Sequence, residues 1–442
     1  MATQGDISAN LRGAGVSNPR ARQRAVAIGV VRGSPGEDAE LDELSELLRT
    51  AGVATLSRVT QQRAEPDPDR YFGRGKLEEL KAEVKRAGAN LVACDDELAP
   101  RQERNLEAAL GVPVIDRTAV ILDIFADHAH SAAGKLQVEL AQLEYNLARM
   151  RGLWTHLERL GAGRMDGGIG TRGPGESQIE TDRRLARDRI SALRRELRHV
   201  ERSRETMRAE RRRSAIPTVA LAGYTNAGKS TLLNAITGAG VSVGDRLFHT
   251  LDPTTRSFEH GGRRYLLTDT VGFIRKLPHQ LVDAFKATLE ETTLADLIVH
   301  VVDGSSTAPS RAAAMRAVDS VLDEIGAGET PRVIAYNKID LLDEPERHDL
   351  LVGQRDAVGI SAVTGEGLGE LLDAIERAFA RTLEPVELLI PYGEGATLNE
   401  LHEVAGQVER EDREDGVLVR ARVPRALAHR FAAYSVNGRT AA

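Results

Sequence analysis

The sequence predicts an α/β protein of several domains, and three observations support that class. Apolar runs alternate with helical patterns over residues 25–115 and again over 216–383, which is typical of mostly parallel sheets covered by helices. A sustained heptad pattern of apolar residues separates the two stretches. At the start of the second stretch, a glycine-rich loop joins an apolar run to a helical segment, the context of a phosphate-binding loop.

The first stretch predicts a small α/β domain over residues 25–134. Its expected strands and helices alternate along the chain: strands at 25–31, 53–60, 90–94 and 112–115, and helices at 37–51, 76–87 and 100–110. Residues 1–24 are rich in glycine, serine, asparagine and arginine, so we expect a disordered lead-in before this domain.

A pair of packed antiparallel helices is predicted over residues 135–213. Apolar residues are spaced alternately by four and three positions from Leu136 to Leu157, and a matching seam runs from Ile190 to Met207. Between them, residues 161–177 contain seven glycines in seventeen positions, which predicts a loop at the tip of a long helical hairpin.

The hairpin is the basic part of an acidic chain. Residues 135–213 hold 19 basic and 12 acidic residues, a balance of +7 in a protein whose net charge is −7. A localised basic element indicates contact with a polyanion, and the flexible tip suits structured RNA. We expect RNA contacts at Arg164, Arg172, Gly173 and Gly175. A solvated pair of charged helices is the alternative that charge alone leaves open.

The glycine-rich loop fits the pattern G-x-x-x-x-G-K-[ST]. Its backbone N–H groups would surround phosphates, its lysine would reach the outer phosphates, and its serine would bind Mg²⁺. The residues expected to bind nucleotide in this loop are Gly223, Tyr224, Thr225, Asn226, Ala227, Gly228, Lys229 and Ser230.

Three later motifs follow in the order of a guanine-nucleotide domain, which we expect over residues 214–383. Asp269 begins an Asp-x-x-Gly segment after a strand and would hold Mg²⁺ through water. The Asp340 carboxylate can accept hydrogen bonds from the N1–H and the exocyclic amine of guanine, a pair of donors that adenine lacks. These motifs predict GTP binding by Asp269, Thr270, Val271, Gly272, Asn337, Lys338, Ile339, Asp340, Ser361, Ala362 and Val363.

The segment between the phosphate loop and Asp269 is expected to sense the nucleotide. A threonine there would complete the Mg²⁺ shell when a γ-phosphate is present. Thr250, Thr254 and Thr255 all qualify, and their spacing does not choose among them.

Two residues bear on hydrolysis. Phe273 follows Gly272, where many GTPases carry a glutamine or histidine that orients water, so we predict slow intrinsic turnover and leave the catalytic residue unassigned. The side-chain oxygen of Asn226 is a candidate ligand for a monovalent cation such as K⁺, although an ordinary turn asparagine is the slightly favoured interpretation.

The remaining composition is that of a soluble globular protein. Cys94 is the only cysteine, no apolar run is long enough to span a membrane, and the first residues lack a signal-peptide core, so we expect a cytoplasmic protein. We also expect a monomer that binds no DNA. Residues 384–442 predict a small α+β module with strands at 386–390 and 416–423 and helices at 398–408 and 424–433.

Together these motifs resemble the HflX family of ribosome-associated GTPases. The resemblance is carried by the segments Gly168–Ser177, Gly223–Ser230, Leu247–Arg256, Asp269–Phe273 and Asn337–Asp340. It implies that Thr250 is the Mg²⁺-binding threonine, with Ser230 as the other protein ligand. It also implies nucleotide contacts by Phe248, His249, Thr250, Leu251 and Asp252.

The resemblance further implies a function. A member would bind the large ribosomal subunit and its rRNA with GTP bound, and would split or rescue stalled ribosomes while hydrolysing GTP to GDP and phosphate. Three alternatives stay open: a large-subunit assembly factor, a signalling GTPase whose hairpin docks a protein partner, and a nucleotide-binding scaffold without useful turnover.

Overall fold

The computed structural model describes residues 23–31, 41–149, 181, 183–200, 216–241, 244, 247–248, 250–276, 286–354, 357–424 and 428–436. Most of the expected lead-in, at residues 1–22, and the whole glycine-rich tip at 161–177 lie outside these ranges. The chain forms two compact units, which we describe separately. The first comprises residues 1–200, 246–249 and 276–285, and the second comprises the remainder.

The first unit is built on a fully parallel sheet of strand order β2-β1-β3-β4. The central strands β1 (Arg24–Val31) and β3 (Leu91–Cys94) consist almost entirely of buried apolar residues, while β2 (Ala54–Gln62) and β4 (Val114–Asp116) form the edges. Helices α2 (Asp42–Thr50), α3 (Arg74–Ala87) and α4 (Pro100–Leu110) alternate with these strands. This arrangement confirms the predicted α/β class.

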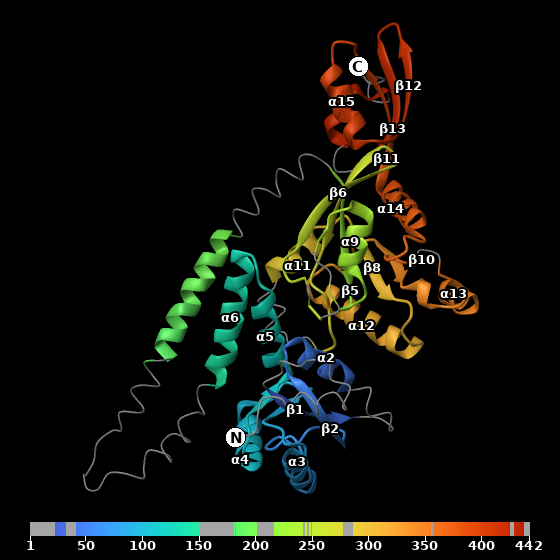
Figure 1. The fold of residues 1–442 in the computed structure, drawn as a ribbon. Coiled ribbons are helices and arrows are strands. Elements are labelled where there is room, and N and C mark those ends of the chain that lie inside the picture. Colours follow the sequence, from blue (N-terminus) through green and yellow to red (C-terminus); the bar gives the residue numbers. More distant parts are fainter. Residues whose placement is uncertain are drawn as a thin grey trace, which may run out of the picture. The chain divides into compact units, whose positions relative to one another are not determined.

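Two further helices extend the first unit. Helix α5 (Arg117–His128), which the sequence analysis did not single out, follows β4 directly, and α6 (Ala132–Arg149) packs beside it (Figure 1). Residues 183–200 are helical and pack on α6 through Leu140, Ile190, Leu193 and Leu197. The heptad seam is therefore present where the structure describes it. Helix α6 thus packs on α5 and also, through the heptad seam, on the helix at residues 183–200.

The second unit holds a six-stranded sheet of order β10-β9-β8-β5-β7-β6. Its strands are β5 (Thr218–Gly223), β6 (Thr254–His260), β7 (Arg263–Asp269), β8 (Leu297–Asp303), β9 (Arg332–Asn337) and β10 (Ala357–Gly359). Only β6 runs antiparallel to its neighbour, so the sheet is mixed and mostly parallel, as predicted.

Helices surround this sheet in the second unit (Figure 1). They are α9 (Lys229–Thr237), α11 (Lys286–Thr293), α12 (Ala308–Glu324), α13 (Glu344–Leu351) and α14 (Leu368–Thr382), with the 3₁₀ turn η2 at Ile339–Leu341. The apolar core joins β5, β7, β8 and β9 to α9 and α14, and includes Leu221, Leu233, Val299 and Ile375. It supports the carboxyl ends of β5, β8 and β9, where parallel α/β sheets place ligands.

The C-terminal module corrects two sequence expectations. Its antiparallel sheet has the order β11-β13-β12, with β11 at Leu383–Ile390 and β13 at Gly416–Pro424. Helix α15 (Gly395–Val404) ends earlier than predicted, because residues Gly406–Arg413 form the edge strand β12. The last expected helix is corrected at both ends: Pro424 belongs to β13, and after the helical residue Ala428 the chain forms a 3₁₀ helix, η3, at His429–Tyr434.

Within the described residues, no helix is long and apolar enough to cross a bilayer.

Candidate nucleotide-binding site

The phosphate-loop motif lies between β5 and α9, and close packing requires both of its glycines. A Cβ atom on Gly223 would lie 2.2 Å from the carbonyl oxygen of Val301 in β8. Gly228 has φ +95° and would place a Cβ 2.2 Å from the Asn337 side-chain nitrogen. Larger residues at either position would therefore displace the loop from the strands that hold it.

Lys229 begins α9 and turns back over the loop. Its ammonium group donates to the carbonyl oxygens of Gly223 at 3.0 Å and Tyr224 at 2.9 Å. Burial lowers the pKa of Lys229 to about 8, against the opposing effect of Asp269. A buried cation next to a helix N-terminus makes this loop attractive to phosphate groups.

Three oxygen-bearing side chains meet beside the loop. The Ser230 hydroxyl donates to Oδ2 of Asp269 at 2.6 Å, and its oxygen lies 2.8 Å from Oγ1 of Thr250. The Oδ1 atom of Asp269 is buried and has no hydrogen-bond partner among the described residues. Burial raises the pKa of Asp269, although Lys229 and Ser230 counteract it. Oxygen donors of this kind suit Mg²⁺, and the second carboxylate oxygen can accept from a metal-bound water.

The three candidate threonines occupy different environments. Thr250 is the one that lies at Ser230. Thr254 and Thr255 belong to β6, and the Thr255 hydroxyl pairs with that of Thr268 at 2.9 Å. The geometry therefore favours Thr250, which the resemblance also indicates.

Phe273 is part of the core rather than of the phosphate-facing surface. Its side chain is 1% exposed. Its N–H donates to the Gly223 carbonyl at 3.1 Å, and its carbonyl accepts from the Thr225 N–H at 2.8 Å. The preceding Gly272 is crowded, because a Cβ there would lie 2.8 Å from Thr225 and 3.1 Å from the Lys229 ammonium. The Asp-x-x-Gly segment is thus hydrogen-bonded to the phosphate loop directly.

At the expected base-binding end, Asn337 joins two loops. Its amide nitrogen donates to the Ala227 carbonyl at 2.8 Å, and its amide oxygen accepts from the Ala362 N–H at 2.9 Å. Ser361 is fully buried, whereas Val363 is 80% exposed. The Asp340 side chain is exposed on the turn η2, where it is accessible to a ligand.

Asp303 is a residue that the sequence analysis missed. It ends β8, and its carboxylate pairs with the Lys338 ammonium at 2.6 Å. Lys338 has φ +68°, an unusual conformation for a non-glycine residue that this ion pair helps to hold. An acidic residue at the carboxyl end of a buried parallel strand was the available signal.

The structure does not place several other expected ligand-binding residues beside Ser230, Thr250 and Asp269. The Phe248 ring packs edge-to-face on Phe125 of α5, with 4.7 Å between ring centroids, in the first unit. His249 and the four expected RNA contacts, Arg164, Arg172, Gly173 and Gly175, lie outside the described residues. Leu251 is buried, and Asn226 is exposed with φ +61°.

Comparisons with known families cover nearly the whole chain. The family described as "GTP-binding GTPase N-terminal" matches residues 38–126, and "GTP-binding GTPase Middle Region" matches 128–211. The family described as "50S ribosome-binding GTPase" matches residues 218–338, and "HflX C-terminal domain" matches 350–431.

Full-length relatives agree. "GTPase HflX" of Caldanaerobacter subterraneus subsp. tengcongensis is 47% identical over 419 residues, 95% of this chain and 95% of the relative. The chain belongs to the HflX family. "GTPase HflX" of Escherichia coli strain K12 is 43% identical over 408 residues, 91% of this chain and 94% of its own. The resemblance seen in the motifs is confirmed, and this HflX-family protein is a GTPase.

Solved structures similar to this HflX-family chain include a GTP-binding protein from the archaeon Sulfolobus solfataricus in complex with GDP. It is 26% identical, with a TM-score of 0.41, and the match covers 80% of this chain and 98% of that one.

Proposed function

We propose that the site binds GTP together with Mg²⁺. The proposal rests on Ser230, Thr250 and Asp269, which meet beside the phosphate loop. The Ser230 hydroxyl oxygen lies 2.8 Å from Oγ1 of Thr250 and 2.6 Å from Oδ2 of Asp269. Ser230 and Thr250 would bind the ion directly, and Asp269 would hold a metal-bound water. Mg²⁺ would supply positive charge to the triphosphate.

We propose that Asp340 selects guanine. Asn337 would support the site indirectly, by holding two of its loops together. Asn337 links Ala227 of the phosphate loop to Ala362 of the loop that would contact guanine O6. This link supports a single rigid site for the phosphates and the base. The exposed Asp340 carboxylate is then free to pair with the two donors on the guanine edge.

For the biological role, we propose GTP-dependent binding to the large ribosomal subunit and separation or rescue of stalled ribosomes in the cytoplasm. The matched family described as a 50S ribosome-binding GTPase supports it, as does the basic balance of residues 135–213. Arginine-rich helices suit phosphate contacts whose strength falls steeply with salt.

The test is density-gradient sedimentation of intact ribosomes with the full chain. A non-hydrolysable GTP analogue is expected to move ribosomes into free subunits, with the protein on the large one, whereas GDP leaves them intact. Co-sedimentation that is equal with both nucleotides would contradict a nucleotide-controlled function.

We further propose that intrinsic hydrolysis is slow and that ribosomes accelerate it. Phe273 is buried in the core and has no group that could orient water. Asn226 is placed on the exposed side of the loop, where K⁺ could replace the positive charge that an arginine supplies in other GTPases. Equal ribosome-stimulated rates in K⁺ and Na⁺ buffers would remove the K⁺ part of the proposal.

A further inference from the structure

A histidine and two carboxylates meet at the turn that joins β6 to β7. His260 is the last residue of β6, and Asp373 and Glu376 project from α14 at positions three apart, which places them on the same helix face. The chain between His260 and Asp373 is long, so the fold rather than local sequence assembles this group.

The three side chains are close enough to share one metal ion, although the His260 and Asp373 atoms also make a direct hydrogen bond. Nε2 of His260 lies 2.8 Å from Oδ1 of Asp373 and 3.7 Å from Oε2 of Glu376, and the ligand atoms all lie within 4.8 Å of one another. Zn²⁺ binds nitrogen and oxygen ligands at about 2.0–2.2 Å, so tetrahedral ligand atoms are separated by roughly 3.3 Å. The two measured separations bracket that value.

The adjacent turn leaves room for the Glu376 carboxylate. Gly261 has φ +59°, and a Cβ there would lie 2.9 Å from Oε1 and 3.0 Å from Oε2 of Glu376. A side chain at this position would therefore push the carboxylate away from His260. The positive φ favours glycine at this turn, and the absence of a side chain leaves space for the Glu376 carboxylate.

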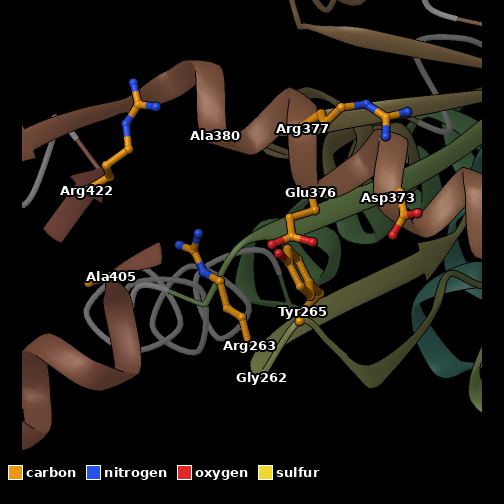
Figure 2. Close-up of a pocket in the computed structure, with 10 residues that line it drawn as sticks. Gly262, Arg263, Tyr265, Asp373, Glu376, Arg377, Ala380, Ala405 and Arg422 are labelled. Atoms are coloured by element: carbon orange, nitrogen blue, oxygen red, sulfur yellow. The ribbon is translucent and has the colours of Figure 1, made fainter. Parts of the chain in front are cut away.

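A cavity of about 330 Å³ opens beside the cluster. Asp373 and Glu376 line it, together with Tyr265 and three arginines, Arg263, Arg377 and Arg422. Figure 2 shows Glu376 projecting from α14 toward Tyr265, with Arg263 extending into the same region. A metal held by three protein ligands would retain a coordination position for water or an anion entering from this cavity.

We propose that His260, Asp373 and Glu376 bind a divalent transition-metal ion of the zinc type. One imidazole and two carboxylates form a ligand set for such ions, for which late first-row metals have the highest affinity. The ion would fasten the β6–β7 turn to α14. This site is separate from the Mg²⁺ site at Asp269, because the intervening length of β7 spans roughly 20 Å at about 3.3 Å per residue.

The test is a Co²⁺ titration of the full chain, freed of metal by a chelator and saturated with GDP and Mg²⁺. Visible absorption reports Co²⁺ binding, and competition by Zn²⁺ reports relative affinity. In excess Mg²⁺, we expect one Co²⁺ per chain beyond any that exchanges into the nucleotide site, displaced by Zn²⁺, and at least tenfold weaker binding of that ion in His260→Ala. The matched control is His402→Ala, since His402 is exposed on α15 and lies outside the cluster; it should titrate as the wild type.

A second variant tests direct ligation. His260→Cys should keep Co²⁺ binding and add an intense thiolate-to-metal absorption band, while the natural Cys94 is buried in the first unit. GDP affinity equal to wild type shows that each variant is folded. The proposal is overturned if Co²⁺ fails to bind, if His260→Ala binds it unchanged, or if His260→Cys binds it without the new band.

Discussion

Asp340 is the residue on which we expect the choice of base to depend. Replacing it with asparagine keeps one acceptor oxygen but puts an amide donor opposite the exocyclic amine of guanine, so one hydrogen bond is lost and two donors face each other. We expect Asp340→Asn to lower GTP affinity by a hundredfold or more, on the order of 3 kcal/mol. Xanthosine triphosphate carries a carbonyl in place of the amine and should regain affinity. Equilibrium titrations with both nucleotides measure this, and an unchanged GTP affinity would refute the assignment.

His300 gives a prediction about acid stability. It lies in the middle of β8, is 3% exposed, and burial lowers its pKa to about 4 from 6.5, with Asp319 opposing and Arg332 adding to the shift. Between pH 6.5 and 4 the unfolded chain therefore binds a proton at this residue that the folded chain does not. The free energy of unfolding falls over that window by up to about 3 kcal/mol from this residue.

The His300→Phe variant isolates that contribution. Denaturant unfolding at pH 7 and pH 4 should show a smaller loss of stability in the variant than in the wild type. The carboxylates elsewhere titrate in both proteins, so the difference between the two pH profiles reports His300 alone. Parallel profiles would show that this histidine is not buried in its neutral form.

At the level of single residues, the sequence predicted the motif residues, but it could not decide between alternative residues outside the motifs. The order of the motifs singles out Lys229, Ser230 and Asp269 as expected site residues, because each belongs to a fixed pattern next to a strand. The sequence did not decide which of three threonines would bind Mg²⁺, because the spacing of residues in a loop does not reveal the path that the loop takes. His260 and Asp373 are 113 positions apart, so no local pattern could join them.

Among the elements, the helical pair gives a matched test of the apolar seam. Leu193 is fully buried between the helices, whereas Leu185 on the same helix is 59% exposed. Leu193→Asp buries an unpaired charge and should open the pair and weaken ribosome co-sedimentation at least tenfold. Leu185→Asp adds the same charge without entering the seam, so it should bind nearly as the wild type does. Equal effects of the two variants would contradict the packing.

The elements that were predicted correctly and those that were not differ in their burial. Strands β5, β8 and β9 are continuous apolar runs, and such runs are evident in a sequence. Strand β12 was missed because Gly406–Arg413 is an edge strand dominated by charged residues, which conceals a period-two pattern. Helix α15 was extended too far for the same reason.

The whole molecule divides into two compact units, which predicts two unfolding transitions. GDP should raise the midpoint of the transition that belongs to the second unit, because the phosphate loop and Asp269 lie there. The other transition should be insensitive to GDP. Differential scanning calorimetry with and without GDP measures both, and a single transition that shifts as a whole would contradict this division.

Arg149 provides the corresponding test for the first unit. Its guanidinium pairs at 2.6 Å with Asp116, a fully buried carboxylate that also accepts from the Tyr145 hydroxyl at 2.8 Å. Arg149→Met leaves that charge without its cation and should destabilise the GDP-insensitive transition by about 3–5 kcal/mol. Arg194→Met removes an exposed pair with Glu144 and should cost about 0.5 kcal/mol or less. A shift in the GDP-sensitive transition instead would contradict the assignment.

At this scale the sequence predicted the order of the parts, and the comparisons confirmed the family. The domain limits, at residues 25–134, 135–213, 214–383 and 384–442, remain our proposal. Segment 246–249 illustrates why limits are hard to derive from sequence. It is flanked on both sides by the nucleotide domain, yet Phe248 packs with Phe125 in the first unit.

The side-chain amide of Asn337 is hydrogen-bonded to Ala227 on one side and to Ala362 on the other. It therefore fixes the distance between the phosphate loop and the loop expected to contact the base. Guanosine alone, or pyrophosphate alone, would gain nothing from that fixed distance, since each touches only one end. A ligand that reaches both ends gains a chelate advantage, because the spacing is set before it arrives. Discrimination in this protein would then be directed at intact nucleotides rather than at their fragments.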